Sequence, residues 1–336
     1  MIVLGIETSC DDTSVAVVKD GVEVLSSVIS SQIALHAPHG GTVPELGARK
    51  HVENITHVYK QAIEEAGILP EQIDRIAVTN SPGLRPALNV GVAFAEGISK
   101  QLNKNLVYIN HLRAHAYSLM LHYDNHTPPT YPLILLIVSG GHTQLGIAKS
   151  PLEFKILGET IDDAAGECFD KVARMLNLPY PGGPYIDKIS QEGDETTIEF
   201  PRPMLQEDNF NFSFSGLKTA VKYYIRDKKI APSTEETNDY NKELLRFQTY
   251  DIAASFQEAV VTVLVQKTVK LANQQKINRV GVVGGVSANS RLRKRMEKTC
   301  EKHDIKAFFP PMKYCMDNAA MVAGLGYFIN EQYNSE

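Results

Sequence analysis

Two histidines, His111 and His115, stand four residues apart. On a helix, residues at i and i+4 lie on one face, so both imidazoles can bind one divalent metal. The chain has 10 histidines, so a chance pair is the open alternative. A metalloprotease of the H-E-x-x-H type needs a glutamate directly after the first histidine. Leu112 stands there, so that protease chemistry is excluded.

A third metal ligand has to come from elsewhere, and Asp317 is a candidate. It stands in the run Cys-Met-Asp-Asn-Ala-Ala, at the start of the last predicted helix. A helix N-cap is the alternative role for an aspartate in that place. Two histidines and one carboxylate with open positions suit Fe²⁺, and Zn²⁺ almost as well.

Glycine-rich turns form a second group of candidates. Residues 139–143 (SGGHT) follow an apolar run and offer backbone N–H groups and hydroxyls to a phosphate. Residues 283–290 (VGGVSANS) join a predicted strand to a predicted helix, although they match neither G-x-G-x-x-G nor a P-loop. Asn289 there can contact a base or ribose, or serve as a helix N-cap. An ordinary hairpin is the alternative for the first turn.

Two further segments carry carboxylates and a rigid turn. Residues 158–174 open a helix on which Asp170 and Lys171 can reach a cleft. Residues 181–184 (PGGP) form a turn on which a flat group can pack, and Asp187 follows on the next helix. A plain loop and a solvated carboxylate are the alternatives.

The elements predicted to position these residues repeat along the chain. A strand, a polar turn and two further strands are predicted over residues 2–29, and residues 133–158 repeat this order of elements. The repeat predicts two similar lobes whose turns, at Ser9 and Ser139, face each other across a cleft. This matched pair favours a nucleotide at the turn of residues 139–143.

Helices and parallel strands follow in both halves, which predicts an α/β architecture. Residues 226–243 are polar with little periodicity, and we expect a surface loop there. The remaining predicted helices cover residues 52–67, with Gly67 as C-cap, then 88–102, 251–274 as a long amphipathic helix, and 290–303; the strands cover residues 75–79, 106–109 and 279–283.

Composition narrows the class of protein. A chain of 336 residues suggests two domains, and 43% hydrophobic with 22% charged residues is ordinary for a globular protein. No apolar run approaches the ~20 residues of a membrane span. The N-terminus lacks the basic region of a signal peptide, and four cysteines without a C-x-x-C pair indicate reduced thiols. We therefore expect a cytoplasmic protein with no membrane partner.

Taken together, the motifs resemble those of the universal family of tRNA N6-adenosine threonylcarbamoyltransferases, in its bacterial form, once described as glycoproteases. The runs that carry the resemblance span nearly the whole chain: GIETSCDDTSVAVV, GGTVPELGARKH, SPGLRPALNVGVAFA, LIVSGGHTQL, GECFDKVAR, YPGGPYID, FSFSGLKTAV, GGVSANSRLR and CMDNAAM. Two departures are visible. Asp12 stands where many relatives have Glu, and Arg113-Ala114 replaces a Glu-Gly pair, which changes the charge beside the metal.

The resemblance implies the actin/sugar-kinase/Hsp70-like (ASKHA) fold. Residues 1–131 and 306–336 would form the lobe with the metal site, and residues 132–305 the lobe with the nucleotide site. It implies iron bound by His111, His115 and Asp317, with zinc as the alternative. It also implies that an adenylate, or an ATP- or ADP-like nucleotide, is held by Ile137, Val138, Ser139, Gly140, Gly141, Asp170, Gly183, Asp187 and Asn289.

The activity so implied is transfer of threonylcarbamoyl from L-threonylcarbamoyl-adenylate to N6 of the adenosine 3′ to the tRNA anticodon (position 37), with release of AMP. No general base is evident, and Asp12 and His142 are candidates. The expected partners are tRNA, a paralogous inactive actin-like protein and a small P-loop ATPase. An actin-like nucleotide-binding regulatory or chaperone-like module is the alternative, because fold does not fix function. Such a module needs no metal site.

A cluster of basic residues is a candidate tRNA contact. Such a run is usually a solvated helix face. Here it follows the predicted adenosine turn, where it can position tRNA phosphates without reading sequence. The cluster, whose exposed face would begin beside the cleft, comprises Arg291, Arg293, Lys294, Arg295, Lys298 and Lys302.

Overall fold

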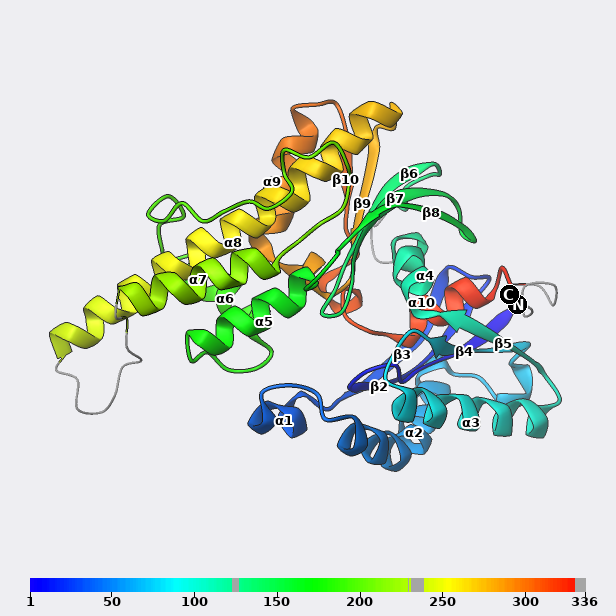
Figure 1. Cartoon of the computed structure of the whole chain (residues 1–336). Coiled ribbons are helices and arrows are strands. Elements are labelled where there is room, and N and C mark those ends of the chain that lie inside the picture. The colour runs from blue at the N-terminus through cyan, green and yellow to red at the C-terminus, as the bar shows by residue number, and fades with distance from the viewer. Residues whose placement is uncertain (123–126, 229, 231–238, 330–336) are drawn as a thin grey trace. The chain divides into compact units, whose positions relative to one another are not determined.

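The computed structural model describes residues 1–122, 127–228, 230 and 239–329. The chain divides into two compact units (Figure 1). The first comprises Met1–Pro132, Ala148–Phe154 and the segment from Pro310 onward, and the second comprises Leu133–Ile147 and Lys155–Phe309.

The first sheet has five strands in the order β3-β2-β1-β4-β5. Strand β2 pairs antiparallel with both β1 and β3, whereas β4 is parallel to both β1 and β5. The strands are β1 (Ile2–Glu7), β2 (Asp12–Lys19), β3 (Glu23–Ser31), β4 (Arg75–Ser81) and β5 (Asn105–Asn110).

The second sheet repeats this order, as β8-β7-β6-β9-β10. Strand β9 is parallel to both β6 and β10, as β4 is to its neighbours in the first sheet. The predicted repeat is therefore confirmed, and with it the α/β class with two similar halves. The strands are β6 (Leu133–Val138), β7 (Thr143–Ser150), β8 (Glu153–Glu159), β9 (Arg279–Val283) and β10 (Lys306–Phe308).

Helices cover both faces of the first sheet, and alternation along β1 shows why. Leu4 and Ile6 pack into a core with α2 and α3, whereas Gly5 points to the opposite face, toward α10. A side chain at Gly5 would overlap the backbone of Ala319, so glycine permits the close approach of α10. The helices of this unit are α1 (Ile33–His36), α2 (Pro44–Ala66), α3 (Arg85–Leu102), α4 (His111–Tyr117) and α10 (Ala319–Gly326).

The two predicted helices after the first three strands begin earlier than expected. A proline stands at the first turn of each, where its missing N–H has no helical partner, so α2 starts at Pro44 and α3 at Arg85. The predicted C-cap at Gly67 is confirmed, with the residue in the left-handed conformation (φ 65°).

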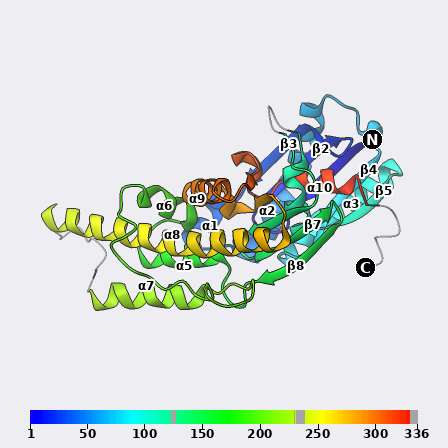
Figure 2. The ribbon, with the colours of Figure 1, turned by 90° about the horizontal axis from the view of Figure 1, so that it is seen from above.

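The long helix α8 (Asp239–Gln275) is the centre of the second unit (Figure 2). It contacts β6 and β9 as well as α6, α7 and α9. The expected one-sided amphipathic pattern is wrong, because residues 252–265 are buried on all sides between sheet and helices. The other helices of this unit are α5 (Ala165–Met175), α6 (Gly182–Ser190), α7 (Ser215–Asp227) and α9 (Ser290–Glu301).

The prediction of a surface loop over residues 226–243 is wrong at both ends of that range. Helix α7, which the sequence patterns did not reveal, extends to Asp227, and α8 already begins at Asp239. Residues 229 and 231–238 lie outside the described residues. Among the helices that are described, none has both the length and the apolar character that crossing a membrane requires.

Candidate metal and nucleotide sites

Helix α4 begins where β5 ends, and this junction positions the two histidines. The Asn110 side chain caps the helix by accepting hydrogen bonds from the N–H groups of Leu112 and Arg113. His111 is then the first helical residue and His115 lies one turn later, both buried. Their ring centroids are 4.6 Å apart, which confirms the predicted helical pair.

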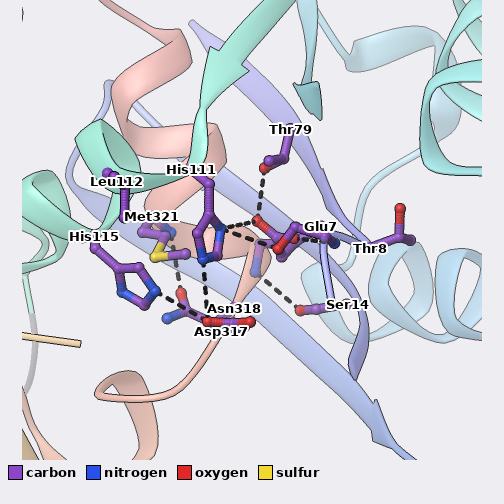
Figure 3. A network of polar contacts seen from close by, with 12 residues as sticks. Glu7, Thr8, Ser14, Thr79, His111, Leu112, His115, Asp317, Asn318 and Met321 are labelled. Carbon is purple, nitrogen blue, oxygen red and sulfur yellow. Dashed lines mark hydrogen bonds and ion pairs between the residues drawn. The ribbon is translucent and has the colours of Figure 1, made fainter. Parts of the chain in front are cut away.

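Asp317 faces these histidines from the segment before α10. The N-cap of α10 is Asn318, whose side chain accepts from the N–H of Met321, so the N-cap alternative for Asp317 is wrong. Its carboxylate is instead directed to the imidazoles (Figure 3). Asp317 Oδ1 lies 3.0 Å from Nε2 of His115 and 3.4 Å from Nε2 of His111.

The three side chains fit a divalent metal. One potential ligand atom of each side chain lies within 4.8 Å of those of the other two. A single ion can contact all three atoms after small side-chain shifts. Two imidazole nitrogens and a carboxylate oxygen suit Fe²⁺ or Zn²⁺, and three protein ligands leave positions open for a substrate. Within the described part of the chain, this is the one cluster of His, Cys, Asp and Glu of that kind.

The opposite charges of the carboxylates and imidazoles in this cluster stabilise one another. Burial opposes ionisation of Asp317, but His111 and His115 hold the pKa of that carboxyl well below its usual value. Burial likewise disfavours a charged His111, but Asp317 and Glu7 raise the pKa of that imidazole well above its usual value. Because a metal displaces the imidazolium proton, metal affinity should rise with pH.

Glu7 is a site residue that the sequence patterns did not reveal. It ends β1, is fully buried, and places Oε2 3.0 Å from Nδ1 of His111. Burial by itself would raise the pKa of Glu7, but the pairing with His111 lowers that pKa below its usual value. The available signal was a carboxylate at the end of an otherwise apolar strand.

The two candidate general bases lie in different units. Asp12 begins β2 in the unit with the metal-site residues, and burial raises its pKa to about 7. No partner within the described structure hydrogen-bonds its buried Oδ1 atom. His142 belongs to the second unit, where its N–H donates to Ser139 Oγ at 3.2 Å. A carboxyl with a pKa near 7 is suited to take up a proton at neutral pH.

The glycine-rich turn after β6 has open space above it. The N–H of Ser139 donates to the carbonyl of His142 at 2.9 Å, and Gly166 on α5 donates its N–H to the carbonyl of Ser139 at 3.2 Å. Gly140 and Gly141 are exposed, and a Cβ at either would meet no atom within 4 Å. Ile137 and Val138 are fully buried, backbone included, beneath this turn.

Contacts between elements link this turn to the other predicted nucleotide residues. Asp170 on α5 accepts from the N–H of Gly182 on α6 at 2.7 Å. Asp187, further along α6, accepts from the N–H of Ser290 on α9 at 3.0 Å. Gly284, after β9, packs directly on the Val138 backbone. The residues therefore gather at the carboxyl ends of β6 and β9, where ligands bind in open α/β sheets.

Two of these residues have structural roles of their own, and a third is open to solvent. Asn289 caps α9 by accepting from the N–H of Leu292 at 2.9 Å, as its alternative role predicts, and donates to Gln257 Oε1 at 2.6 Å. Asp187 is not merely solvated, because it anchors the start of α9. Gly183 has no neighbour that a Cβ would meet. Nucleotide binding by these residues stays a prediction.

The basic residues on α9 separate into two groups. Arg291 pairs with Glu195 and Glu258, and Arg295 also pairs with Glu258. Arg293 donates to the Ser287 carbonyl at 2.7 Å and lies over the Phe309 ring. The expected exposed basic face is thus wrong for the arginines. The lysines Lys294, Lys298 and Lys302 are exposed.

Fold and site together define an α/β protein that repeats one strand order and carries a His-His-Asp cluster in its first unit. Solved structures share this fold. HypF from T. kodakarensis has a TM-score of 0.60 at 14% identity, over 97% of this chain and 48% of that one. Component A of (R)-2-hydroxyglutaryl-CoA dehydratase from Acidaminococcus fermentans has a TM-score of 0.54 at 16% identity, over 97% and 98%. The ASKHA-like fold is confirmed.

Sequence comparison gives the family. Residues 23–324 match the family model described as tRNA N6-adenosine threonylcarbamoyltransferase. Proteins of that name from Thermosipho africanus (51% identical, over 97% of this chain and 94% of that one) and Caldicellulosiruptor saccharolyticus (47%, over 98% and 93%) are similar to it. The chain belongs to the tRNA N6-adenosine threonylcarbamoyltransferase family, as its motifs indicate.

Proposed function

We propose that this chain transfers the threonylcarbamoyl group from L-threonylcarbamoyl-adenylate to N6 of the adenosine at tRNA position 37, with release of AMP. The observation that carries the proposal is the cluster of His111, His115 and Asp317, with both histidines buried, in a chain of this family. A nucleotide-binding regulatory or chaperone-like module would have no use for such a cluster, so the cluster favours the transferase.

The chemistry demands positioning more than a strong nucleophile. The N6 amine is a poor nucleophile because its lone pair is delocalised into the ring, so catalysis depends on orientation and on stabilising the developing charge. His111, His115 and Asp317 would hold Fe²⁺ or Zn²⁺, which would supply Lewis-acid polarisation of the threonylcarbamoyl group. The Ser139 turn holds the departing phosphate with backbone N–H groups, and Asp12 takes up the N6 proton.

The direct test is a transfer assay with purified components. The chain is supplied with Fe²⁺ or Zn²⁺, L-threonylcarbamoyl-adenylate and tRNA, with and without a paralogous actin-like protein and a small P-loop ATPase, which we propose as its partners. Mass spectrometry of the digested tRNA should show threonylcarbamoyladenosine, and none when guanosine replaces adenosine 37. Protein purified without added metal should contain iron or zinc. Nucleotide binding with neither modification nor metal would support the regulatory module instead.

The exposed lysines of α9 are the proposed contact for tRNA phosphates. Reversal of Lys294 and Lys298 to Glu should weaken tRNA binding at low salt roughly tenfold, and should reduce the salt dependence of log K by about 2, one per lost phosphate contact. Fluorescence anisotropy titrations at several salt concentrations measure both quantities. The lysines are the test positions because the arginines of the cluster hold α9 to its neighbours.

A matched control makes an equal change in net charge on another surface. Lys60 on α2 and Lys100 on α3 are exposed lysines of the first unit, and their reversal to Glu should leave the salt slope nearly unchanged. If both double variants weaken tRNA binding equally, the effect is one of net charge alone. An unchanged slope in the α9 variant would place the tRNA on another surface.

A further inference from the structure

The carboxylate of Glu7 lies behind the ring of His111, opposite the proposed metal position. His111 Nδ1 is 3.0 Å from Glu7 Oε2, while His111 Nε2 is 3.4 Å from Asp317 Oδ1 (Figure 3). The two ring nitrogens therefore face different carboxylates. Glu7 is fully buried, so its carboxylate has only protein groups as partners.

Two further donors fix the orientation of the Glu7 carboxylate. Ser9 donates its backbone N–H to Oε1 at 2.5 Å, and Thr79 donates its hydroxyl to Oε2 at 2.6 Å. A backbone N–H can only donate, so the oxygen that faces Ser9 has to remain an acceptor. The Ser9 hydroxyl lies 3.2 Å from His111 Nδ1, so a second oxygen faces the same ring nitrogen.

The turn that carries Ser9 is held by the start of α3. The N–H of Leu84 donates to the Ser9 carbonyl at 2.8 Å, and the Thr8 hydroxyl donates to the Ala87 carbonyl at 2.9 Å. Gly83 and Gly91 allow this contact, because a Cβ at Gly83 would lie 2.6 Å from the Ser9 carbonyl oxygen and one at Gly91 would overlap the Thr8 hydroxyl. The motif SPGLRPALNVG thus supports the back of the metal site.

We propose that Glu7 is a positioning residue, which holds His111 in the tautomer with its proton on Nδ1 and so directs the Nε2 lone pair to the metal. Carboxylates commonly orient metal-binding histidines in this way. His115 has no such support, because no group in the described structure hydrogen-bonds its buried Nδ1. Among the two histidines, only His111 therefore has a carboxylate behind its Nδ1. This inference rests on the proposed metal site but not on the transfer reaction.

Glu7→Gln is the decisive variant, because it replaces one carboxylate oxygen, an acceptor, by an NH₂ group, a donor. The shape of the side chain hardly changes. The amide oxygen has to face the Ser9 N–H, so the amide NH₂ faces His111 Nδ1 and the Thr79 hydroxyl. The hydroxyl can rotate to accept, but Nδ1 can accept only if the ring proton moves to Nε2. An Nε2 that carries a proton cannot bind a metal, so Zn²⁺ affinity should fall about 10- to 100-fold.

Two measurements test this without the transfer reaction. Competition with a chromophoric chelator gives the Zn²⁺ affinity, and ¹⁵N NMR of the imidazole nitrogens with one equivalent of Zn²⁺ gives the tautomer. The wild type should show the His111 proton on Nδ1, and Glu7→Gln should show it on Nε2. Wild-type Zn²⁺ affinity in a folded Glu7→Gln variant, or weaker binding with the proton still on Nδ1, would overturn the proposal.

Matched variants separate positioning from general damage. Thr79→Ser keeps the hydroxyl and should keep wild-type Zn²⁺ affinity, whereas Thr79→Val removes it and should lower the affinity several-fold. Glu258→Gln changes a buried carboxylate in the second unit and should leave Zn²⁺ binding unchanged. If Glu7→Gln fails to fold, the Thr79 pair decides, and equal affinities overturn the proposal. A wild type that binds Zn²⁺ but transfers nothing would refute the proposed function alone.

Discussion

Alanine in place of His111, His115 or Asp317 is expected to remove the bound metal and to lower the transfer rate by at least roughly 100- to 1,000-fold, the scale of losing one electrostatic stabiliser. Each residue supplies one of three converging ligand atoms, and no other cluster of this kind occurs in the described structure to replace it. Metal content by mass spectrometry and transfer to tRNA measure the two effects.

The controls distinguish loss of the metal from loss of the fold. His57→Ala removes an exposed histidine of α2 and should change neither quantity. Because His115 is fully buried, His115→Asn, which fills more of the space than alanine, should be tested beside His115→Ala. Denaturant unfolding of the metal-free proteins should show that the variants remain folded. Full metal content and full activity in any one variant would remove that residue from the site.

The second large effect is expected from valine at Gly140. A Cβ at this position meets no protein atom within 4 Å, so the variant should fold as stably as the wild type. Its side chain would fill the space that the adenylate phosphate is proposed to occupy. We expect affinity for a non-hydrolysable adenylate analogue to fall about 100-fold, or roughly 2.8 kcal/mol, by isothermal titration calorimetry.

Two other glycines of the second unit serve as controls, which show whether the effect is specific to the space beside Gly140. Gly216 on α7 is exposed and also has free space around its Cβ position, so Gly216→Val should bind the analogue normally. Gly166→Val should lower the stability, because a Cβ there would lie 2.6 Å from the Ser139 carbonyl oxygen and force the turn to move. Wild-type affinity in Gly140→Val would show that the turn does not bind the phosphate.

Sequence alone was sufficient for the features that a few neighbouring residues encode. The strand, turn and strand pattern around Ser9 recurs around Ser139, and it predicts the repeated sheet because strand periodicity is local. The His111–His115 spacing predicts one helical face, and Gly67 predicts a helix end, for the same reason. The motifs also indicate the family, since their order spans nearly the whole chain.

Features that join distant residues were decided only by the tertiary structure. Glu7 contacts His111 across 104 positions of sequence, and no local pattern encodes that contact. Arg295 looks like part of a solvated basic face until α8 brings Glu258 to it. Residues 252–265 of α8 are buried on all sides because sheet and helices surround them, which the periodicity of the helix does not reveal. The chemical type of a side chain determines what it can bind, but the packing of the chain determines which partner it contacts.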